Sequence, residues 1–591
     1  MDFYTGKVLR LDLTRLTATD EALNLEWAQL YAGGKGLLFR YLYEELPPGT
    51  DPWSPDNPLI LATGPFAGTA VATCSRLVVG CKSPLTGGLL DSYVGGSFGP
   101  ELKFAGYDMV ILSGRASEPV VIRIEDGRVE FIPAVPRYWG MVTSEIEQDV
   151  RENLGPRHKV LSIGPGGENL VPFACLSTDQ YHKAGRGGAG AVMGAKNVKA
   201  LVVRGTGSVG VGDARAFARD MLRLQNERVL TVDNMWTFEE GTPMMVDLVD
   251  QAGGLPTRNW QTGSFGGAGL INSQALLQRR TRVRACTQCP LACRQVHAFN
   301  GYECEGPEYE TLGVCGANCG ISDLEALAAF NRECDELGID TIASGAVVAL
   351  AMGLREAGVA DYGLEFGDPG GYVEAPRLIA TRSGIGADLA LGAKALTAKH
   401  GRPGLAAEVK SMDMPAYDPR AFYGMALAYA TSDRGACHMR AFAAGDELFG
   451  ARAPDTLEGK AQHVIDLQDF GALAWTGIWC ANMALDVSFV AEHFRHLWRR
   501  QVGEDELMTL GARVWSLGRL LNLREGLGAS DDSMPSRLLK VPHPNGPAAG
   551  RIIGQEAFQA SLCEYYAIRG WDAQGVPTEE RLSTLGVDVR L

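Results

Sequence analysis

Hydrophobic and polar positions alternate in the N-terminal part of the chain, and helical periodicity replaces this alternation further on. Residues 6–14, GKVLRLDLT, alternate as a half-buried strand does. From about residue 213, apolar residues recur at helical spacing, as in DARAFARDMLRLQNERV and AEHFRHLWRRQVG. Further strands are predicted at PLILATG, RLVVGCK, DMVILSG, KALVVRG and PVVIRIEDGRVEFIP, where EDG predicts a hairpin turn.

This change of pattern predicts an α+β protein. A chain of 591 residues is too long for a single hydrophobic core. We expect a strand-rich N-terminal domain over residues 1–210, followed by two mainly helical domains over 211–415 and 416–591. The second boundary rests on the turn-rich sequence MDMPAYDPRAF.

Composition and charge narrow the classes of protein that this chain can belong to. A net charge of −15 argues against general nucleic-acid binding, which needs a basic surface. No apolar run reaches about 18 residues, so no membrane span is expected. The first residues, MDFYTGKVLRLDL, do not resemble a secretory signal, so the 13 cysteines are expected to be reduced, some of them as metal ligands. We therefore predict a cytoplasmic protein that contacts neither nucleic acid nor membrane.

Glycine-rich loops with basic residues predict a ligand that carries more than one phosphate. Residues 92–106 and 182–196 interleave glycines with lysine and arginine, so backbone N–H groups and cationic side chains face the same ligand. A third loop, LSIGPGGENL (161–170), superficially resembles a dinucleotide fingerprint, but no βαβ unit with a following acidic residue supports NAD. The alternative for each loop is a tight turn or a close strand crossing.

Three cysteines in RACTQCPLACRQVH, namely Cys286, Cys289 and Cys293, have the spacing C-x2-C-x3-C. A [4Fe–4S] cluster usually takes four thiolates, so its fourth ligand would come from elsewhere in the chain. His297 could instead complete a zinc site. A third alternative is a set of buried thiols without a metal. The density of cysteines favours the cluster.

Residues 322–358 predict two helices that meet at DELGID. Ser322 and Glu325 form a capping box for the first helix. Gly338 permits the reversal, and Asp340 can cap the second helix. The carboxylates of DELGID are either simple caps or a binding site for a guanidine-like ring edge, which offers parallel N–H donors.

Other histidines and cysteines are not expected to bind metal. His493 and His496 lie three positions apart on a predicted helix without a matching carboxylate motif, and we interpret them as a solvated helix face. The spacing of the following four cysteines is irregular, so buried thiols are expected: Cys304, Cys315, Cys319 and Cys334.

Ten motifs run along essentially the whole chain, namely GKVLRLDLT, GPFAGT, SRLVVGCKSPLTG, FGPELKFAGYD, AGRGGAGAVMGAKNVKAL, CTQCPLAC, GPEYETLG, DELGIDT, TSDRGACH and NLREGLGASDDSMPSRLL. Taken together and in this order, they resemble the aldehyde ferredoxin oxidoreductase family. The family implies a strand-rich domain under two pyranopterins that bind tungsten, with Mg²⁺ bridging the pterin phosphates, a [4Fe–4S] cluster and two helical domains that close over the metal.

The resemblance also implies which residues bind these cofactors. Cys480 is the implied fourth cluster ligand beside Cys286, Cys289 and Cys293. The aspartate expected five or six residues before it is Trp475 or Ala474 here, so this pterin must be bound differently, with an aromatic face as one solution. The other implied cofactor-binding residues are Arg76, Tyr93, Gly95, Lys183, Ala184, Gly185, Arg186, Asp335, Ile339, Asp340, Arg434 and Arg440.

The implied reaction is oxidation of an aldehyde with water to a carboxylate, with release of two electrons and two protons. Glu310 would activate the water, His438 would bind the carbonyl oxygen, and Tyr309 would donate a further hydrogen bond. One cluster passes one electron at a time, so a ferredoxin or ferredoxin-like subunit is the expected partner, in a homo- or hetero-oligomer. The alternatives are a ring-reducing acyl-CoA subunit of the same family, a non-catalytic iron–sulfur protein and a zinc-stabilised binding protein.

Overall fold

The N-terminal part of the chain forms two six-stranded mixed sheets in the computed structural model, which describes residues 2–591. The first sheet has the strand order β2-β1-β6-β3-β4-β5, in which only β1 and β6 pair in parallel. Every residue of β3, β4 and β5 is buried, because both faces of the sheet are covered. Its strands are β1 (Lys7–Asp12), β2 (Thr17–Ala22), β3 (Leu59–Thr63), β4 (Leu77–Lys82), β5 (Leu89–Val94) and β6 (Met109–Ser113).

The second sheet has the strand order β11-β10-β9-β12-β7-β8. Its β7–β8 hairpin turns at Asp126 and Gly127, where both residues have positive φ, so the predicted EDG turn is confirmed. Alternate residues of both sheets share one hydrophobic core with the short helices α3 (Phe98–Phe104) and α6 (Ala189–Ala195). Its strands are β7 (Val120–Glu125), β8 (Arg128–Pro133), β9 (Lys159–Ser162), β10 (Leu176–Thr178), β11 (His182–Ala184) and β12 (Val198–Arg204).

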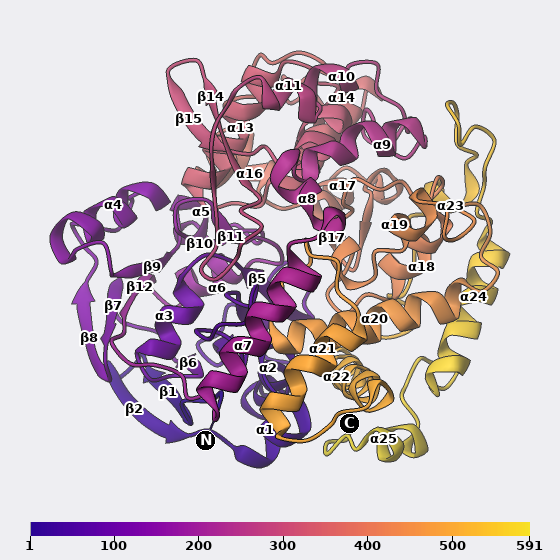
Figure 1. The fold of residues 1–591 in the computed structure, drawn as a ribbon. Coiled ribbons are helices and arrows are strands. Elements are labelled where there is room, and N and C mark those ends of the chain that lie inside the picture. The colour runs from indigo at the N-terminus through magenta and orange to yellow at the C-terminus, as the bar shows by residue number, and fades with distance from the viewer. Residues whose placement is uncertain (1) are drawn as a thin grey trace.

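Helices cover the other face of the first sheet and make up most of the remaining chain (Figure 1). Buried side chains of β3 and β4 belong to the same core as α2 (Gly34–Glu45), α20 (Lys460–Gly477) and α22 (Glu504–Arg524). The C-terminal helices therefore pack onto the N-terminal sheet. The predicted order, a strand-rich region followed by mainly helical ones, is confirmed, with the change between β12 and α7 (Ala214–Leu224). The domain boundaries at 210 and 415 stay predictions.

Two parts of the predicted helical region are sheets instead. The smaller is the pair β16 (Glu408–Val409) and β17 (Met412–Asp413). In the larger, three antiparallel strands follow one another, and the three clustered cysteines lie between the first two. Arginines occupy most of the first strand, so its apolar pattern is too weak to predict a strand. The strands are β13 (Arg280–Arg284), β14 (Arg294–Phe299) and β15 (Tyr302–Glu305).

The predicted helix pair is present as α13 (Leu324–Leu337) and α14 (Thr341–Glu356). Gly338 adopts the left-handed conformation with φ of 67°, and the carboxylate of Asp340 accepts a hydrogen bond from the N–H of Ile342, as predicted. The predicted capping box is wrong by one residue. Asp323 caps α13, and the side chain of Glu325 pairs with Arg279 instead of turning back to the cap.

The prediction of a solvated face is also wrong for His493 in α21 (Val487–Trp498). Its side chain is buried, its ring packs 5.3 Å from that of Trp479, and burial lowers its pKa to about 4. Nδ1 of His493 donates to the carbonyl of Phe489, while His496 lies 3.1 Å from Asp220. The four cysteines expected to be buried thiols are all buried: Cys304, Cys315, Cys319 and Cys334. Within residues 2–591, no helix combines the length and apolar character that a membrane crossing requires.

Candidate active site

The clustered cysteines and Cys480 meet at one loop of the N-terminal region. Cys286, Cys289 and Cys293 lie between β13 and β14, whereas Cys480 follows α20. The N–H of Thr73 donates to the carbonyl of Gln288 at 3.1 Å, and the N–H of Cys480 donates to the carbonyl of Thr73 at 3.1 Å. One residue of the N-terminal region thus holds both cysteine-bearing segments.

Basic residues surround this set of thiols. Nη2 of Arg76 lies 2.9 Å from Sγ of Cys480, and although burial opposes ionisation, this cation lowers the pKa of the Cys480 thiol. Burial, with a further contribution from the charge on Cys480, raises the pKa of Cys289 to about 12. His182 and Arg294, which the motif reasoning missed, also lie here: His182 Nε2 is 4.0 Å from Cys286 Sγ and Nδ1 is 3.3 Å from Arg294 Nη2.

The four thiols equal in number the ligands of a [4Fe–4S] cluster, whereas a zinc site was predicted to take His297 as its fourth donor. His297, the candidate fourth zinc ligand, lies on β14 and donates through Nδ1 to the carbonyl of Gly306 at 2.8 Å. Four cysteines on two segments, with a cation beside one sulfur, match the ligands that a [4Fe–4S] cluster takes.

The DELGID turn docks against the glycine loops of the N-terminal region. The carbonyl of Gly338 accepts from the N–H of Cys175 at 2.8 Å, and the N–H of Asp340 donates to Phe173 at 3.1 Å. A β-carbon on Gly164 would lie 2.4 Å from the backbone of Leu337. The glycines of the 161–170 loop therefore permit close packing, which is the alternative interpretation of that loop.

Arg186 connects the second glycine loop to this turn and to the C-terminal part of the chain. Its Nε lies 3.4 Å from Oδ2 of Asp340, Nη1 donates to the carbonyl of Ala436 at 2.6 Å, and Nη2 donates to that of Asp413. Lys183, in the same loop, lies 3.5 Å from Asp335. Lys183 and Arg186 thus each meet a carboxylate of DELGID, whereas Lys196 at the end of the loop donates to the carbonyls of Pro55 and Gly114.

Four further predicted residues lie where the N-terminal glycine loops meet the cysteine loop and the DELGID turn. We call this region the junction. Gly95 borders the cysteine loop, because a β-carbon there would lie 3.0 Å from Sγ of Cys286. Ala184 ends β11, and the carbonyl of Gly185 accepts from the thiol of Cys175 at 3.0 Å. Ile339 forms an isolated bridge with Ala174.

Arg434 and Arg440 are held by a buried cluster of charges that the motif reasoning missed. Lys35 Nζ lies 3.0 Å from Asp91 Oδ2 and 2.5 Å from Asp433 Oδ2. Arg440 donates from Nε to Asp433 at 2.9 Å and from Nη2 to Asp91, and Arg434 donates to the carbonyl of Asp91 at 2.7 Å. Burial opposes the charge on Asp91, but the surrounding cations outweigh it and lower the pKa of the carboxyl.

Tyr93 and Trp475 extend this cluster toward the cysteines. Their ring centroids are 4.2 Å apart, and the hydroxyl of Tyr93 donates to Asp91 at 2.6 Å. The guanidinium of Arg76 lies 5.7 Å from the centroid of Trp475. Trp475, one of the two positions where the family's aspartate is expected, thus contacts Tyr93 and lies near the arginine that contacts Cys480.

Glu310 and His438 face one another at the centre of the site. Glu310 lies in the short helix α12 (Tyr309–Thr311), and its Oε1 is 3.5 Å from Nδ1 of His438, the first residue of the 3₁₀ turn η6 (His438–Arg440). The other oxygen, Oε2, accepts from the N–H of Ala416 at 2.8 Å. The hydroxyl of Tyr309 donates to the carbonyl of the same Ala416, so it supports the residue that holds Glu310.

Burial sets the charge of this pair. It raises the pKa of Glu310 to about 8 and, with the nearby cation of Arg186, lowers the pKa of His438 to about 3. At neutral pH the pair is therefore a protonated carboxyl beside a neutral imidazole. Such shifts are typical of groups that exchange protons during catalysis.

Several buried polar atoms at this junction have no hydrogen-bond partner among the described residues. Unpartnered buried polar atoms are costly, so they mark a place where a polar ligand fits. The atoms are both carboxylate oxygens of Asp413, Nε of Arg434, Nη1 of Arg440, Oε1 of Glu310 and Nδ1 of His438.

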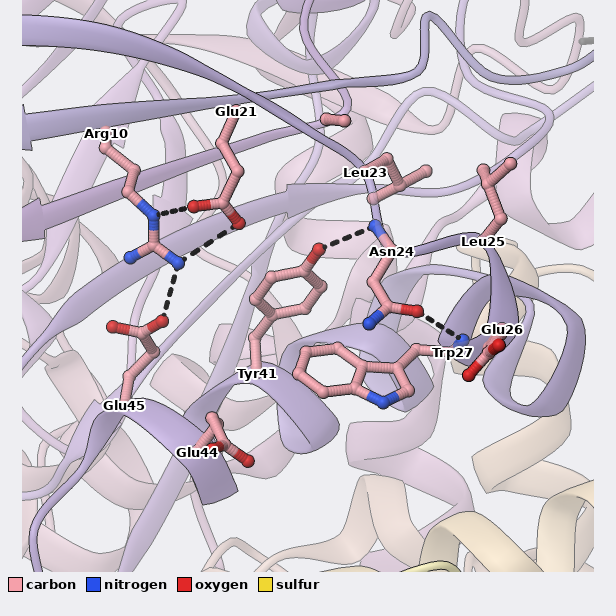
Figure 2. Close-up of a pocket in the computed structure, with 11 residues that line it drawn as sticks. Arg10, Glu21, Leu23, Asn24, Leu25, Glu26, Trp27, Tyr41, Glu44 and Glu45 are labelled. Carbon is pink, nitrogen blue, oxygen red and sulfur yellow. Dashed lines mark hydrogen bonds and ion pairs between the residues drawn. The ribbon is translucent and has the colours of Figure 1, made fainter.

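A surface pocket of about 550 Å³ lies elsewhere, between the β1–β2 hairpin and helices α1 (Leu25–Tyr31) and α2 (Figure 2). Several of its polar groups already have partners within the protein. Arg10 donates to Glu21 and to Glu45, and the N–H of Asn24 donates to the hydroxyl of Tyr41 at 3.1 Å (Figure 2). The candidate chemistry therefore lies at the buried junction and not in this pocket.

Comparison with known proteins assigns the chain to a family. Residues 8–205 match the family model described as aldehyde ferredoxin oxidoreductase, N-terminal domain, and residues 222–587 match aldehyde ferredoxin oxidoreductase, domains 2 and 3. The chain belongs to the aldehyde ferredoxin oxidoreductase family, which confirms the resemblance drawn from its motifs.

Relatives match over nearly their whole length. The tungsten-containing aldehyde ferredoxin oxidoreductase of Pyrococcus abyssi is 38% identical over 99% of both chains, and that of Pyrococcus furiosus is 37% identical over 98% of both. An aliphatic sulfonate oxidoreductase, WOR-like subunit, of Pyrococcus furiosus is 30% identical over 99% of this chain and 97% of its own. The solved active-site complex BamBC of benzoyl coenzyme A reductase shares the fold, with a TM-score of 0.85 and 24% identity over 99% of this chain and 97% of that chain.

Proposed function

We propose that the protein is a tungsten-dependent oxidoreductase that oxidises aldehydes to carboxylic acids with water as the oxygen source. Two electrons leave one at a time through a [4Fe–4S] cluster to ferredoxin or to a partner subunit. The observation that carries this proposal is the neutral Glu310–His438 pair, whose facing atoms have no other partner among residues 2–591. Full-length similarity to tungsten-containing relatives supports it.

The residues present fit the cofactors of such an enzyme. Cys286, Cys289, Cys293 and Cys480 would hold the cluster. A tungsten bis-pyranopterin, when bound, would supply the two-electron oxidation, with Mg²⁺ between its phosphates. Its polar groups would form hydrogen bonds with the buried unpartnered atoms and ion pairs with the cations of the junction. The proposed binding residues are Arg76, Tyr93, Gly95, Lys183, Ala184, Gly185, Arg186, Asp335, Ile339, Asp340, Arg434 and Arg440.

Glu310 and His438 divide the proton chemistry between them. With a pKa of about 8, Glu310 is mostly protonated at neutral pH, and its deprotonated fraction, which grows as pH rises, can take a proton from water and release it again. His438 stays neutral, so it can donate one ring N–H to the carbonyl oxygen of the aldehyde without carrying a charge into the site. Tyr309 acts through Ala416, which fixes the second oxygen of Glu310.

The likeness of fold to the benzoyl coenzyme A reductase complex supports one second candidate, the reductive catalytic subunit of a ring-reducing acyl-CoA complex. That enzyme would reduce benzoyl-CoA with a low-potential donor. Aldehyde oxidation would then be slow or absent.

Metal content and a substrate panel test the proposal together. We expect about one tungsten and four irons per chain in anaerobically purified protein, measured by plasma mass spectrometry. The same protein should reduce benzyl viologen with at least one aldehyde and should not turn over benzoyl-CoA. Iron without tungsten or molybdenum, in protein from a host that makes the cofactor, would contradict the proposal and favour an electron carrier.

Replacing Cys480 by serine is expected to lower the iron content and to abolish the visible absorption of the cluster, because a thiolate ligand is lost. The matched control is Cys563→Ser, since Cys563 is exposed and lies in α24 (Gln555–Arg569), outside the site. Iron analysis and absorption spectra of both variants give the answer. Full iron in Cys480→Ser would remove Cys480 from the proposed ligand set.

A further inference from the structure

A group of exposed apolar side chains lies on one short stretch of the surface. Val232 is 89% exposed, and Met235 and Phe238 are 37% and 39% exposed. All three lie in α8 (Val232–Glu239) at intervals of three residues, so they share one side of the helix. Leu230, just before the helix, is 44% exposed. Contiguous exposed apolar groups of this kind mark sites of association. We call Leu230, Val232, Met235 and Phe238 the α8 face.

The helix that carries the α8 face is bonded to both cysteine-bearing segments. The side chain of Asn234 accepts from the N–H of Ala484 at 2.8 Å, four residues after Cys480. On the other side, Arg280 of β13 donates to the carbonyl of Glu239 at 2.9 Å, and β13 leads directly into Cys286. In Figure 1, α7 and α8 lie next to one another on the side that faces the viewer.

Residues beside the cysteines are exposed, and β13 adds two arginines, of which Arg280 is exposed and Arg284 half-buried. Ala285, Gln288 and Ala481, each next to or close to a cluster cysteine, are exposed. Arg280 and Arg284 of β13 donate to carbonyl and amide oxygens, so no carboxylate in these contacts neutralises them. This local charge is opposite in sign to the net charge of −15 of the chain.

We propose that the α8 face, together with β13, is the docking surface for a small acidic iron–sulfur electron-transfer protein. This inference rests on the proposed function, because it assumes that electrons leave through the cluster. The apolar side chains of the α8 face would be buried in the contact, and Arg280 and Arg284 would orient an acidic partner. Docking there places the partner against the segments that hold Cys286 and Cys480.

A second copy of the chain is a poorer occupant of this surface. In a two-fold contact the same patch meets itself, so Arg280 and Arg284 would approach their own copies. An acidic protein of another kind does not place arginine against arginine.

Binding of a purified acidic [4Fe–4S] ferredoxin to the holoenzyme tests the docking surface. The variant Val232→Asp/Met235→Asp places two negative charges on exposed positions, so it should fold normally and repel the partner. We expect its Kd, from biolayer interferometry at low salt, to rise by about tenfold or more. The control is Phe449→Asp, an exposed apolar residue after α19 (Ala443–Leu448), with an unchanged Kd.

A dye assay separates this inference from the proposed function. Aldehyde oxidation with benzyl viologen should be the same in the double variant, the control and the wild type, because the dye needs no docking surface. An unchanged ferredoxin Kd in the double variant, or no binding by the wild type, would overturn the docking surface. So would a change of oligomeric state in light scattering, which would make the α8 face a contact between copies. A wild type that oxidises no aldehyde would overturn the proposed function. The ferredoxin Kd of the wild type and the double variant would still show whether the α8 face is the docking surface.

Discussion

Replacing Glu310 by glutamine is expected to lower kcat/KM for aldehyde oxidation by a factor of about 10² to 10⁴, the usual contribution of a general base. The amide keeps the shape of the side chain and can still accept from the N–H of Ala416, but it cannot take a proton. Tungsten and iron contents should not change. The measurement is anaerobic dye-linked turnover together with metal analysis.

The activity that depends on Glu310 is expected to increase with pH. Because the pKa of Glu310 is raised to about 8, the basic form increases as pH rises, and kcat/KM of the wild type should climb through about pH 8. The Glu310→Gln variant should lack this limb. Glu303→Gln, in β15 and paired with Arg282 at the surface, is the control and should keep it. A limb near pH 8 that persists in Glu310→Gln would assign it to another group.

The same shift has a consequence for stability. A carboxyl whose folded pKa is raised binds its proton more tightly in the folded state, so its contribution is present below about pH 4.5 and is lost as pH rises through about 8. The wild type should therefore lose more stability between pH 6 and pH 9 than Glu310→Gln, in thermal denaturation of the two proteins. An equal loss would show that Glu310 does not titrate in this range.

Replacing Asp91 by asparagine is expected to cost about 3–5 kcal/mol in the free energy of unfolding and to reduce bound tungsten. Asp91 is fully buried, and the change leaves the equally buried Lys35 and Arg440 without their shared carboxylate. Removing one partner of a buried ion pair is costly because the other charge stays desolvated. The hydroxyl of Tyr93 also donates to the Asp91 carboxylate, so a further proposed cofactor-binding residue would lose a charged partner, whereas Arg434 keeps its bond to the Asp91 backbone carbonyl.

Denaturation in urea and tungsten analysis of the same preparations check this expectation. The matched control is Asp20→Asn, which breaks the pair of Lys7 and Asp20 in the same sheet, where both side chains are about half exposed. An exposed pair contributes about 1 kcal/mol or less. If Asp91→Asn loses no more stability than this control and keeps its tungsten, the buried charge cluster has no supporting role.

Much of the first region could be predicted from sequence because its strands carry their own signal. β1, β3, β4 and β6 bury alternate or all side chains, and these apolar runs are visible without a structure. β2 and β13 are among the strands that were not predicted. Their sequences, TATDEA and RTRVR, contain little that is apolar, and they lie at edges where pairing with one neighbour, and not burial, makes them strands.

The sequence by itself determined the family of this protein, the thiol ligands and the acid–imidazole pair as candidates, because local motifs carry these residues. Only the tertiary structure decided how they are supported. Lys35, Asp91 and Asp433 come from three distant parts of the chain, and nothing local marks them as partners. Their attraction requires low dielectric and contact, which exist only after the C-terminal helices have packed onto the N-terminal sheet. Trp475 likewise comes close to both Tyr93 and Arg76 only through this packing.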